Sequence, residues 1–231
     1  MLNAIGINEM SYIWQKIDSI QQQIPQNVRL IAITKQVSVE AMREAYATGI
    51  RDFGENRLQE ALFKQEQLQD LKDINWHFIG HIQKNKAKKI IEHFTWIHSV
   101  DSLALAKRLN RLAEELNQIP KVFLQVKVLP DPNKYGWQVT DLLQELSQLS
   151  EYRHLDFQGL MTILPLGLSS TEVVEAFQET RQLAIDIKQK GYATLTMKEL
   201  SMGMSGDYMQ AIEAGATMIR LGRIIFGERN S

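Results

Sequence analysis

The sequence predicts an α/β protein built as a single (β/α)8 TIM barrel with an additional N-terminal helix. Three observations lead to this fold class: short apolar runs alternate with amphipathic segments, eight such runs occur in 231 residues, and no linker-like stretch divides them. Alternation of this kind is typical of a parallel sheet, and eight units in a chain of this length are typical of a closed barrel. The main alternative is an open doubly wound sheet, which at this size usually has fewer strands.

The first amphipathic segment spans residues 10–24, where isoleucines recur at three- and four-residue spacing, as on one face of a helix. The apolar runs that follow are short enough to be buried strands and cover residues 28–34, 51–54, 74–79, 95–99, 121–128, 155–161, 196–200 and 217–221. The segments between them predict helices at residues 38–47, 57–71, 85–93, 102–117, 140–149, 171–190 and 206–214. Because little chain follows the eighth strand, we expect the leading helix to fill the last gap in the outer ring.

Local signals mark where several of these helices begin and end. Ser169-x-x-Glu172 matches a capping box at a helix start. Gly49, Gly191 and Gly215 follow periodic segments, where glycine commonly ends a helix. Since no Pro-, Gly- or Ser-rich stretch separates the units, we expect residues 1–231 to form a single domain.

Composition excludes several classes of function. The chain carries 26 Lys and Arg against 27 Asp and Glu, a formal net charge of −1, and no Cys. A near-neutral balance argues against nucleic acid as the main partner, because such domains usually carry a basic excess. The lack of Cys excludes disulfides, thiolate metal sites and cysteine nucleophiles. His77 and His81 lack a third ligand nearby in the sequence, so we expect no metal site.

The chain shows no sign of a membrane or secreted protein. No apolar run approaches the roughly 20 residues needed to span a bilayer. The first residues also lack a basic segment followed by an apolar core, which a secretory signal requires. We therefore expect no membrane partner and a cytoplasmic location.

Lys35 follows directly on the apolar run of the first expected strand. In a TIM barrel, ligands bind at the C-terminal ends of the strands. A lysine that turns into the barrel mouth there is desolvated, and desolvation makes the amine a better nucleophile near neutral pH. This is the setting that a Schiff-base lysine needs. The alternative is a lysine that leaves the strand into solvent.

Two further features lie at the ends of the seventh and eighth strands, where barrels often bind phosphate. Residues 201–207 (SMGMSGD) combine small residues and hydroxyls at a helix start, which suits an anion; the alternative is a glycine-containing loop with an N-cap. Residues 220–223 (RLGR) place Arg220 in an apolar strand, where a guanidinium requires a partner. Together with Lys35, these features indicate a phosphorylated carbonyl ligand, which periodicity alone does not name.

Seven short stretches, in order along nearly the whole chain, resemble the pyridoxal phosphate homeostasis proteins, the YggS/PROSC family. They are AITK at 32–35, FGEN at 53–56, WHFIG at 76–80, Q-x-N-K at 83–86, GLM at 159–161, LSMGMS at 200–205 and RLG-x-x-x-FG at 220–227. The set is specific, although no single stretch would be.

This resemblance implies a barrel like the N-terminal domain of alanine racemase that holds pyridoxal 5′-phosphate (PLP) as a Schiff base on Lys35. Arg220 would face the pyridine nitrogen, and Asn56 and His77 would line the pocket. The phosphate would be held from two sides. Ser201 and the backbone of Gly203, Met204 and Ser205 would contribute from the first glycine-containing stretch, and Gly222 and Arg223 from the second. The chain departs from many relatives at Arg223, where a small hydroxyl residue is common, so only the backbone N–H or the added charge would serve there.

The resemblance also implies a role in PLP homeostasis, and indirectly in amino-acid and keto-acid balance, without a recognised catalytic reaction. Arg220 can donate a hydrogen bond to the ring nitrogen but effectively never gives up its proton, which leaves the ring a poor electron sink. A low-activity racemase or lyase is the alternative; a racemase needs a second acid or base, for which Tyr46, Tyr135 and Tyr208 are candidates. A third hypothesis is a barrel isomerase or aldolase that acts on a phosphorylated sugar through Lys35. The expected partners are PLP and, for handover, apo PLP-enzymes or a regulatory protein, and relatives suggest a monomer.

Overall fold

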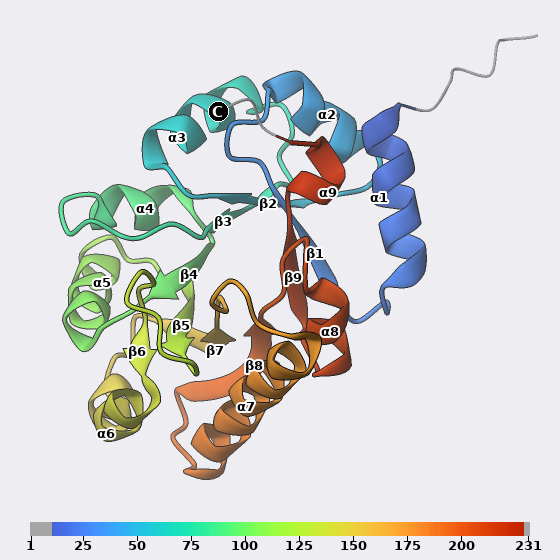
Figure 1. Ribbon diagram of the computed structural model, residues 1–231. Helices are drawn as coiled ribbons and strands as arrows, with labels where there is room; N and C mark the ends of the chain where they lie inside the picture. The colour runs from blue at the N-terminus through green and yellow to red at the C-terminus, as the bar shows by residue number, and fades with distance from the viewer. Residues whose placement is uncertain (1–10, 229–231) are drawn as a thin grey trace, which may run out of the picture.

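Eight parallel strands close into a barrel in the computed structural model, which describes residues 11–228 (Figure 1). β1 lies between β2 and β9, and the pairing of β4 with β5 closes the ring, so the neighbours run β4-β3-β2-β1-β9-β8-β7-β5. The (β/α)8 fold class predicted from the sequence is therefore confirmed. The barrel strands are β1 Arg29–Ile33, β2 Asp52–Glu55, β3 Asn75–Phe78, β4 Trp96–Val100, β5 Lys121–Lys127, β7 Asp156–Met161, β8 Leu195–Ser201 and β9 Met218–Leu221.

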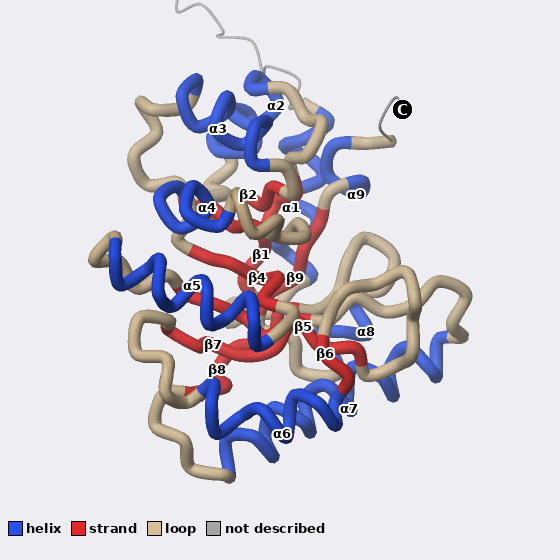
Figure 2. The backbone as a smooth tube through the Cα atoms, turned by 90° about the vertical axis from the view of Figure 1, so that its left-hand side faces the viewer, coloured by secondary structure: helices blue, strands red, loops and turns tan. Residues whose placement is uncertain are grey.

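The helices form a ring outside the barrel (Figure 2). Their bounds are α1 Tyr12–Gln23, α2 Val39–Ala47, α3 Leu58–Gln67, α4 Ala87–His93, α5 Leu103–Glu115, α6 Val139–Leu149, α7 Ser170–Gln189, α8 Tyr208–Glu213 and α9 Arg223–Phe226. α1 packs against α2 and α9 and fills the gap in the ring, as expected from the sequence. Among the described residues, no helix is long and apolar enough to cross a membrane.

Two short elements were not expected from the sequence. β6 (Trp137–Gln138) pairs with β5 beyond the barrel layer, through Val126 and Lys127. α9 follows β9 directly and has only four residues. Elements this short carry too few residues for a periodic pattern, so sequence periodicity could not reveal them.

The helix boundaries follow the predicted local signals. At the start of α7, the Ser169 side chain accepts from the Glu172 N–H, while the Glu172 carboxylate accepts from the Ser169 N–H, a complete capping box. Gly49, Gly191 and Gly215 all have positive φ after helices α2, α7 and α8. The expected first residue of the leading helix, Met10, lies outside the described residues.

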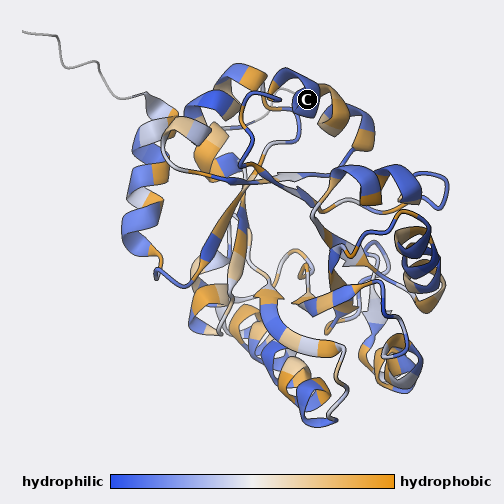
Figure 3. Cartoon of the chain, turned by 180° about the vertical axis from the view of Figure 1, so that it is seen from behind, coloured by the Kyte–Doolittle hydropathy of each residue, from blue (hydrophilic) through white to orange (hydrophobic). Residues whose placement is uncertain are grey.

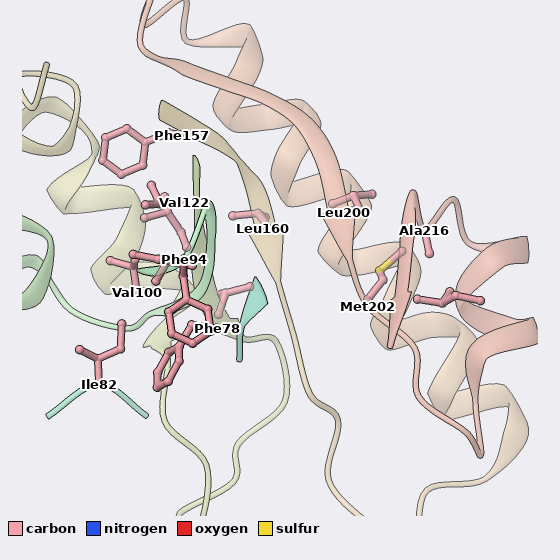
Figure 4. Close-up of a cluster of buried hydrophobic side chains, with 14 of the residues drawn as sticks. Phe78, Ile82, Phe94, Val100, Val122, Phe157, Leu160, Leu200, Met202 and Ala216 are labelled. Carbon is pink, nitrogen blue, oxygen red and sulfur yellow. The ribbon is translucent and has the colours of Figure 1, made fainter. Parts of the chain in front are cut away.

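The apolar core has two layers. The outer layer fills the space between strands and helices, where Phe78 and Phe94 meet edge to face at 5.1 Å (Figure 4). Each helix of the outer ring carries both hydrophilic and hydrophobic residues (Figure 3). The inner layer is a smaller cluster made of Ile31, Ile33, Trp96, Phe123, Met161 and Met218. Because side chains alternate along a strand, the residues between these apolar ones face the helices, and a polar residue in phase with them faces the barrel interior.

Candidate functional site

Apart from His77, the sequence-predicted residues gather at the C-terminal mouth of the barrel, on strands that are neighbours in the ring. Lys35 follows β1 and Asn56 follows β2, while the loop at 201–205 ends β8 and the segment at 220–223 ends β9. The order β2-β1-β9-β8 brings these four strand ends side by side. The structure therefore unites segments that are up to 188 residues apart, from 35 to 223.

The backbone on both sides of Lys35 is held by two side chains of α3, the buried Lys64 and the partly buried Glu60. The Lys64 ammonium donates to the Thr34 carbonyl at 2.6 Å, and Glu60 accepts from the Gln36 N–H. Gln36 has a φ of 60°, an uncommon conformation for a residue other than glycine. Thr34 is buried and donates from its hydroxyl to Glu55. Lys35 itself is half-buried in the turn that follows β1, at the C-terminal mouth of the barrel.

Lys64 is the centre of this cluster and was missed from the sequence. It is 3% exposed and pairs with Glu55 at 2.8 Å and with Glu60 at 2.6 Å. Burial raises the pKa of the Glu55 carboxyl despite the nearby ammonium. Burial also acts on Glu60, but hydrogen bonds from Lys64 and the Gln36 N–H outweigh it and lower the pKa of that carboxyl. In the sequence, a charged residue on an amphipathic helix is expected to be exposed to solvent. Only the packing in the structure shows that Lys64 is buried.

The loop after β8 is built around a required glycine. Gly203 has a φ of 93°, and a Cβ at this position would lie 2.6 Å from the Cβ of Ala211. The Met204 N–H donates to Asp207 Oδ1 at 2.6 Å, which ties the loop to the start of α8. The Ser205 hydroxyl accepts from the Ile224 N–H at 3.4 Å and joins this loop to α9. The two stretches predicted to hold phosphate are therefore in direct contact.

Unpaired N–H groups are concentrated where these two stretches meet. Within residues 11–228, no acceptor takes a hydrogen bond from the backbone N–H of Gly203, Ser205, Gly222 or Arg223. Gly203 and Gly222 are buried residues, and the Arg223 side chain is exposed. Buried donors normally find partners, so this cradle fits an anion such as a phosphate group.

Arg220 lies inside the barrel below that cradle and is 3% exposed. Its guanidinium donates to the Ser201 hydroxyl at 2.7 Å and to the Thr162 carbonyl at 2.8 Å. No carboxylate of residues 11–228 forms an ion pair with it. Burial lowers the pKa of Arg220 to about 10, although the charge of Asp207 acts in the opposite direction. The side chain remains a cation with donors to spare, which suits the nitrogen of an aromatic ring.

His77 occupies the barrel interior, and both of its ring nitrogens are engaged. Nε2 lies 2.9 Å from Asp52 Oδ1, and Nδ1 lies 2.9 Å from His98 Nε2. His98 in turn contacts the Ser201 hydroxyl at 2.8 Å. The role of His77 as a cofactor contact stays a prediction. His98 was missed from the sequence, where the only signal is a polar residue inside the apolar run WIHSV.

Asn56 borders the mouth beside β3. Its side-chain Oδ1 is buried without a hydrogen-bond partner, and the chain at Gly80 packs so closely that a Cβ there would lie 2.1 Å from the Asn56 carbonyl. A cavity of about 330 Å³ next to it is lined by Asn56, Arg57, His81, Lys86 and neighbouring side chains. Asn56 thus offers an unused polar atom at the rim of the site.

The three tyrosines lie in different places. Tyr135 is exposed on the loop after β5 and stacks on His81 at 3.7 Å between ring centres, at the mouth of the barrel. Tyr46 hydrogen-bonds Asp73, which precedes β3 at the opposite end. Tyr208 is buried at the start of α8. Of these three, Tyr135 is the one that is accessible at the mouth.

Comparison with known proteins identifies the family. Residues 10–230 match the model of the alanine racemase N-terminal domain. A pyridoxal phosphate homeostasis protein of Synechocystis is 55% identical over 206 residues, which cover 89% of this chain and 94% of that protein. This chain belongs to the family of pyridoxal phosphate homeostasis proteins. The Escherichia coli member is 36% identical over 89% of this chain and 88% of its own length.

Solved structures agree with the family and the fold. PipY of Synechococcus elongatus, described with PLP bound, is 50% identical, with a TM-score of 0.89 over 93% of this chain and 100% of that chain. The same protein without PLP gives a TM-score of 0.90 at 51% identity. An alanine racemase of Clostridium difficile shares the fold at 15% identity, with a TM-score of 0.79. The resemblance to this family that the sequence motifs predicted is confirmed.

Proposed function

We propose that this protein binds PLP as a Schiff base on Lys35 and acts in PLP homeostasis, and through it in amino-acid and keto-acid balance. One observation carries the proposal. Lys35 follows β1, and the adjacent strand β9 carries Arg220 and leads directly into one half of a cradle of unpaired N–H groups. An amine, an anion cradle and a buried cationic donor match the aldehyde, phosphate and ring nitrogen of PLP. The PLP-bound relative, at 50% identity, supports this assignment.

Each residue has a distinct part in this proposal. The backbone N–H groups of Gly203, Ser205, Gly222 and Arg223 bind the phosphate, and Arg220 orients the ring through its nitrogen. Met204 contributes through the shape of the loop, since its N–H is engaged by Asp207. Asn56 lies at the rim of the pocket. When bound, PLP supplies an aldehyde that condenses with amines and a ring that withdraws electrons.

We propose that the protein has no catalytic reaction of its own. The curated relatives are named as homeostasis proteins. Arg220 keeps its proton at neutral pH, so the ring nitrogen receives a hydrogen bond but no proton, which weakens the ring as an electron sink. A racemase or lyase of low activity is the second candidate, and Tyr135 at the mouth is the observation that favours it. Turnover of an amino acid that is lost in Lys35→Ala would establish the enzyme.

The decisive experiment is borohydride reduction followed by intact mass and peptide mapping. We expect a phosphopyridoxyl group on Lys35 in the wild-type protein and none in Lys35→Ala. Lys88→Ala, which removes an exposed lysine of α4, is the matched control and should retain the adduct. If no adduct formed on Lys35 even after PLP was added, the proposal would be wrong. A sugar adduct on Lys35 would then favour an isomerase or aldolase.

The remaining expectations are part of the same proposal. Handover of PLP requires an apo PLP-enzyme or a regulatory protein as partner. A monomer, a cytoplasmic location and a single domain over residues 1–231 stay predictions. Residues 1–10 and 229–231 lie outside the described part of the chain.

A further inference from the structure

A line of hydrogen bonds runs through the barrel from one mouth to the other. It starts at Arg220 and Ser201 near the C-terminal ends of the strands and passes through His98 and His77. It ends at Asp52, the first residue of β2, at the N-terminal mouth. The four links measure 2.7, 2.8, 2.9 and 2.9 Å. We call these five residues the interior line.

The chemistry of its two ends fixes the direction of every hydrogen bond. Arg220 can only donate, so the Ser201 oxygen accepts from it and the Ser201 hydroxyl is free to donate onward. A carboxylate can only accept, so His77 must donate from Nε2 to Asp52. With both rings neutral, His77 then accepts at Nδ1 from His98 Nε2, and His98 accepts at Nδ1 from Ser201. Each ring has a proton on Nε2 and none on Nδ1.

The surroundings favour the neutral form of both imidazoles and pack against their rings. Burial lowers the pKa of His77, although the hydrogen bond and charge of Asp52 act in the opposite direction. Burial, together with the positive charge of Arg220, lowers the pKa of His98 well below its usual range. The His77 ring stacks on Trp96, and the His98 ring stacks on Phe123.

Other charges near the line do not interrupt it. Arg29 and Lys121 lie over the Trp96 ring, at 4.9 and 4.7 Å from its centre. Neither lies within ion-pair distance of Asp52; among residues 11–228, the only basic side chain within that distance of Asp52 is His77, through the hydrogen bond already described. Asp52 therefore serves as the acidic end of a line whose basic end is Arg220.

We infer that Asp52, His77 and His98 are positioning residues. They hold the Arg220 guanidinium in place through Ser201, and they direct the Ser201 hydroxyl proton to His98 in the barrel interior. The inference rests on the proposed function and deepens it, because Arg220 is the residue assigned to the ring nitrogen. It also has a consequence for the phosphate. Ser201 has one proton, and that proton points to His98, so the hydroxyl donor to the phosphate is Ser205.

The inference links the ligand site to the opposite face of the barrel. Asp52 lines a surface cavity of about 360 Å³ with Gln26, Gly49, Arg51 and other residues before β1 and β2. Its side chain is 15% exposed. A change at this distant carboxylate is therefore expected to reach the ligand site through two histidine rings.

Nitrogen-15 NMR of the histidines in the PLP-free protein tests the line directly. We expect the wild-type spectrum to show both interior histidines neutral, protonated at Nε2 and bare at Nδ1. In Asp52→Asn, the side-chain amide can both donate and accept, so the direction of the hydrogen bonds along the line is no longer fixed. We therefore expect His77 and His98 to populate both tautomers. Asp156→Asn, which alters the first residue of β7 at the same end, is the matched control and should resemble the wild type.

The second measurement is the PLP titration of the same proteins by absorbance. Network substitutions of this kind change coupling by about two- to thirtyfold, so we expect Asp52→Asn to weaken PLP binding within that range and to shift the absorption band of the bound cofactor. His98→Gln should shift the band in the same way. A wild-type histidine with its proton on Nδ1 would overturn the inference, as would an Asp52→Asn protein that matches Asp156→Asn in both measurements. Failure of the proposed function is distinct, because it appears as a missing Lys35 adduct in the wild-type protein.

Discussion

At the scale of single residues, Gly203 shows how backbone freedom and close packing coincide at the site. Its positive φ suits glycine, and its neighbour Ala211 leaves no room for a Cβ. The same loop carries the unpaired N–H groups assigned to the phosphate. A glycine in this place therefore serves both the fold and the anion cradle.

Gly203→Ala is expected to lower the free energy of unfolding by roughly 1–3 kcal/mol, through strain in the backbone and the contact with Ala211. PLP binding should weaken as well, since the cradle shifts. Urea denaturation and PLP titration measure the two effects. Gly206→Ala is the matched control, because a Cβ there meets nothing within 4 Å. Equal stability of the two variants would contradict the prediction.

At the scale of elements, the helices and strands position the site through their ends. β1 and β9 are direct neighbours, so the ends of both strands lie side by side at the C-terminal mouth. α3 supplies Lys64 and Glu60, which hold the backbone on either side of Lys35. The outer helices are tied down in turn by their caps, as the start of α7 illustrates.

Ser169→Ala removes one half of the capping box of α7. Loss of an N-cap hydroxyl typically costs about 1 kcal/mol, and we expect a decrease of that size in the free energy of unfolding by urea denaturation. Ser170→Ala alters the next residue, whose side chain has no hydrogen bond in residues 11–228, and should change stability by less than about 0.5 kcal/mol. A Ser169→Ala protein as stable as Ser170→Ala would show that the cap is not needed.

At the scale of the whole molecule, the barrel encloses a polar line within an apolar interior. His77 and His98 are fully buried, and burial lowers the pKa of both below the ordinary value of about 6.5. The folded protein therefore resists protonation at these sites, while the unfolded chain takes up protons freely. The stability of the entire barrel is linked to pH through this difference.

We expect the free energy of unfolding to be largest above about pH 6.5 and to fall as the pH drops below it. The unfolded state then binds more protons than the folded one, so stability rises with pH. Each histidine contributes at most about 1.4 kcal/mol per pH unit over this window. Urea denaturation between pH 5 and 8 measures the slope, and His98→Gln should reduce it. An identical slope in both proteins would argue against this origin.

The sequence by itself determined the alternation of strands and helices, the capping box and glycines at helix ends, and the family. These features are local: periodicity, caps and glycine positions are written over a few consecutive residues. Lys35 and Arg220 stood out for the same reason, because each is a charged residue at the end of, or inside, an apolar run, and Gly203 stood out in a loop of small residues and hydroxyls.

Only the tertiary structure decided which distant residues meet. His98 and Ser201 are 103 residues apart, and their contact depends on closure of the barrel and on the register of its strands. No sequence signal singles out Asp52 or Lys64, yet Asp52 ends the interior line and Lys64 is buried with its ammonium on the Thr34 carbonyl. The physical reason is that a hydrogen bond depends on distance in space, and the periodicity of a segment holds no information about its partner across the barrel.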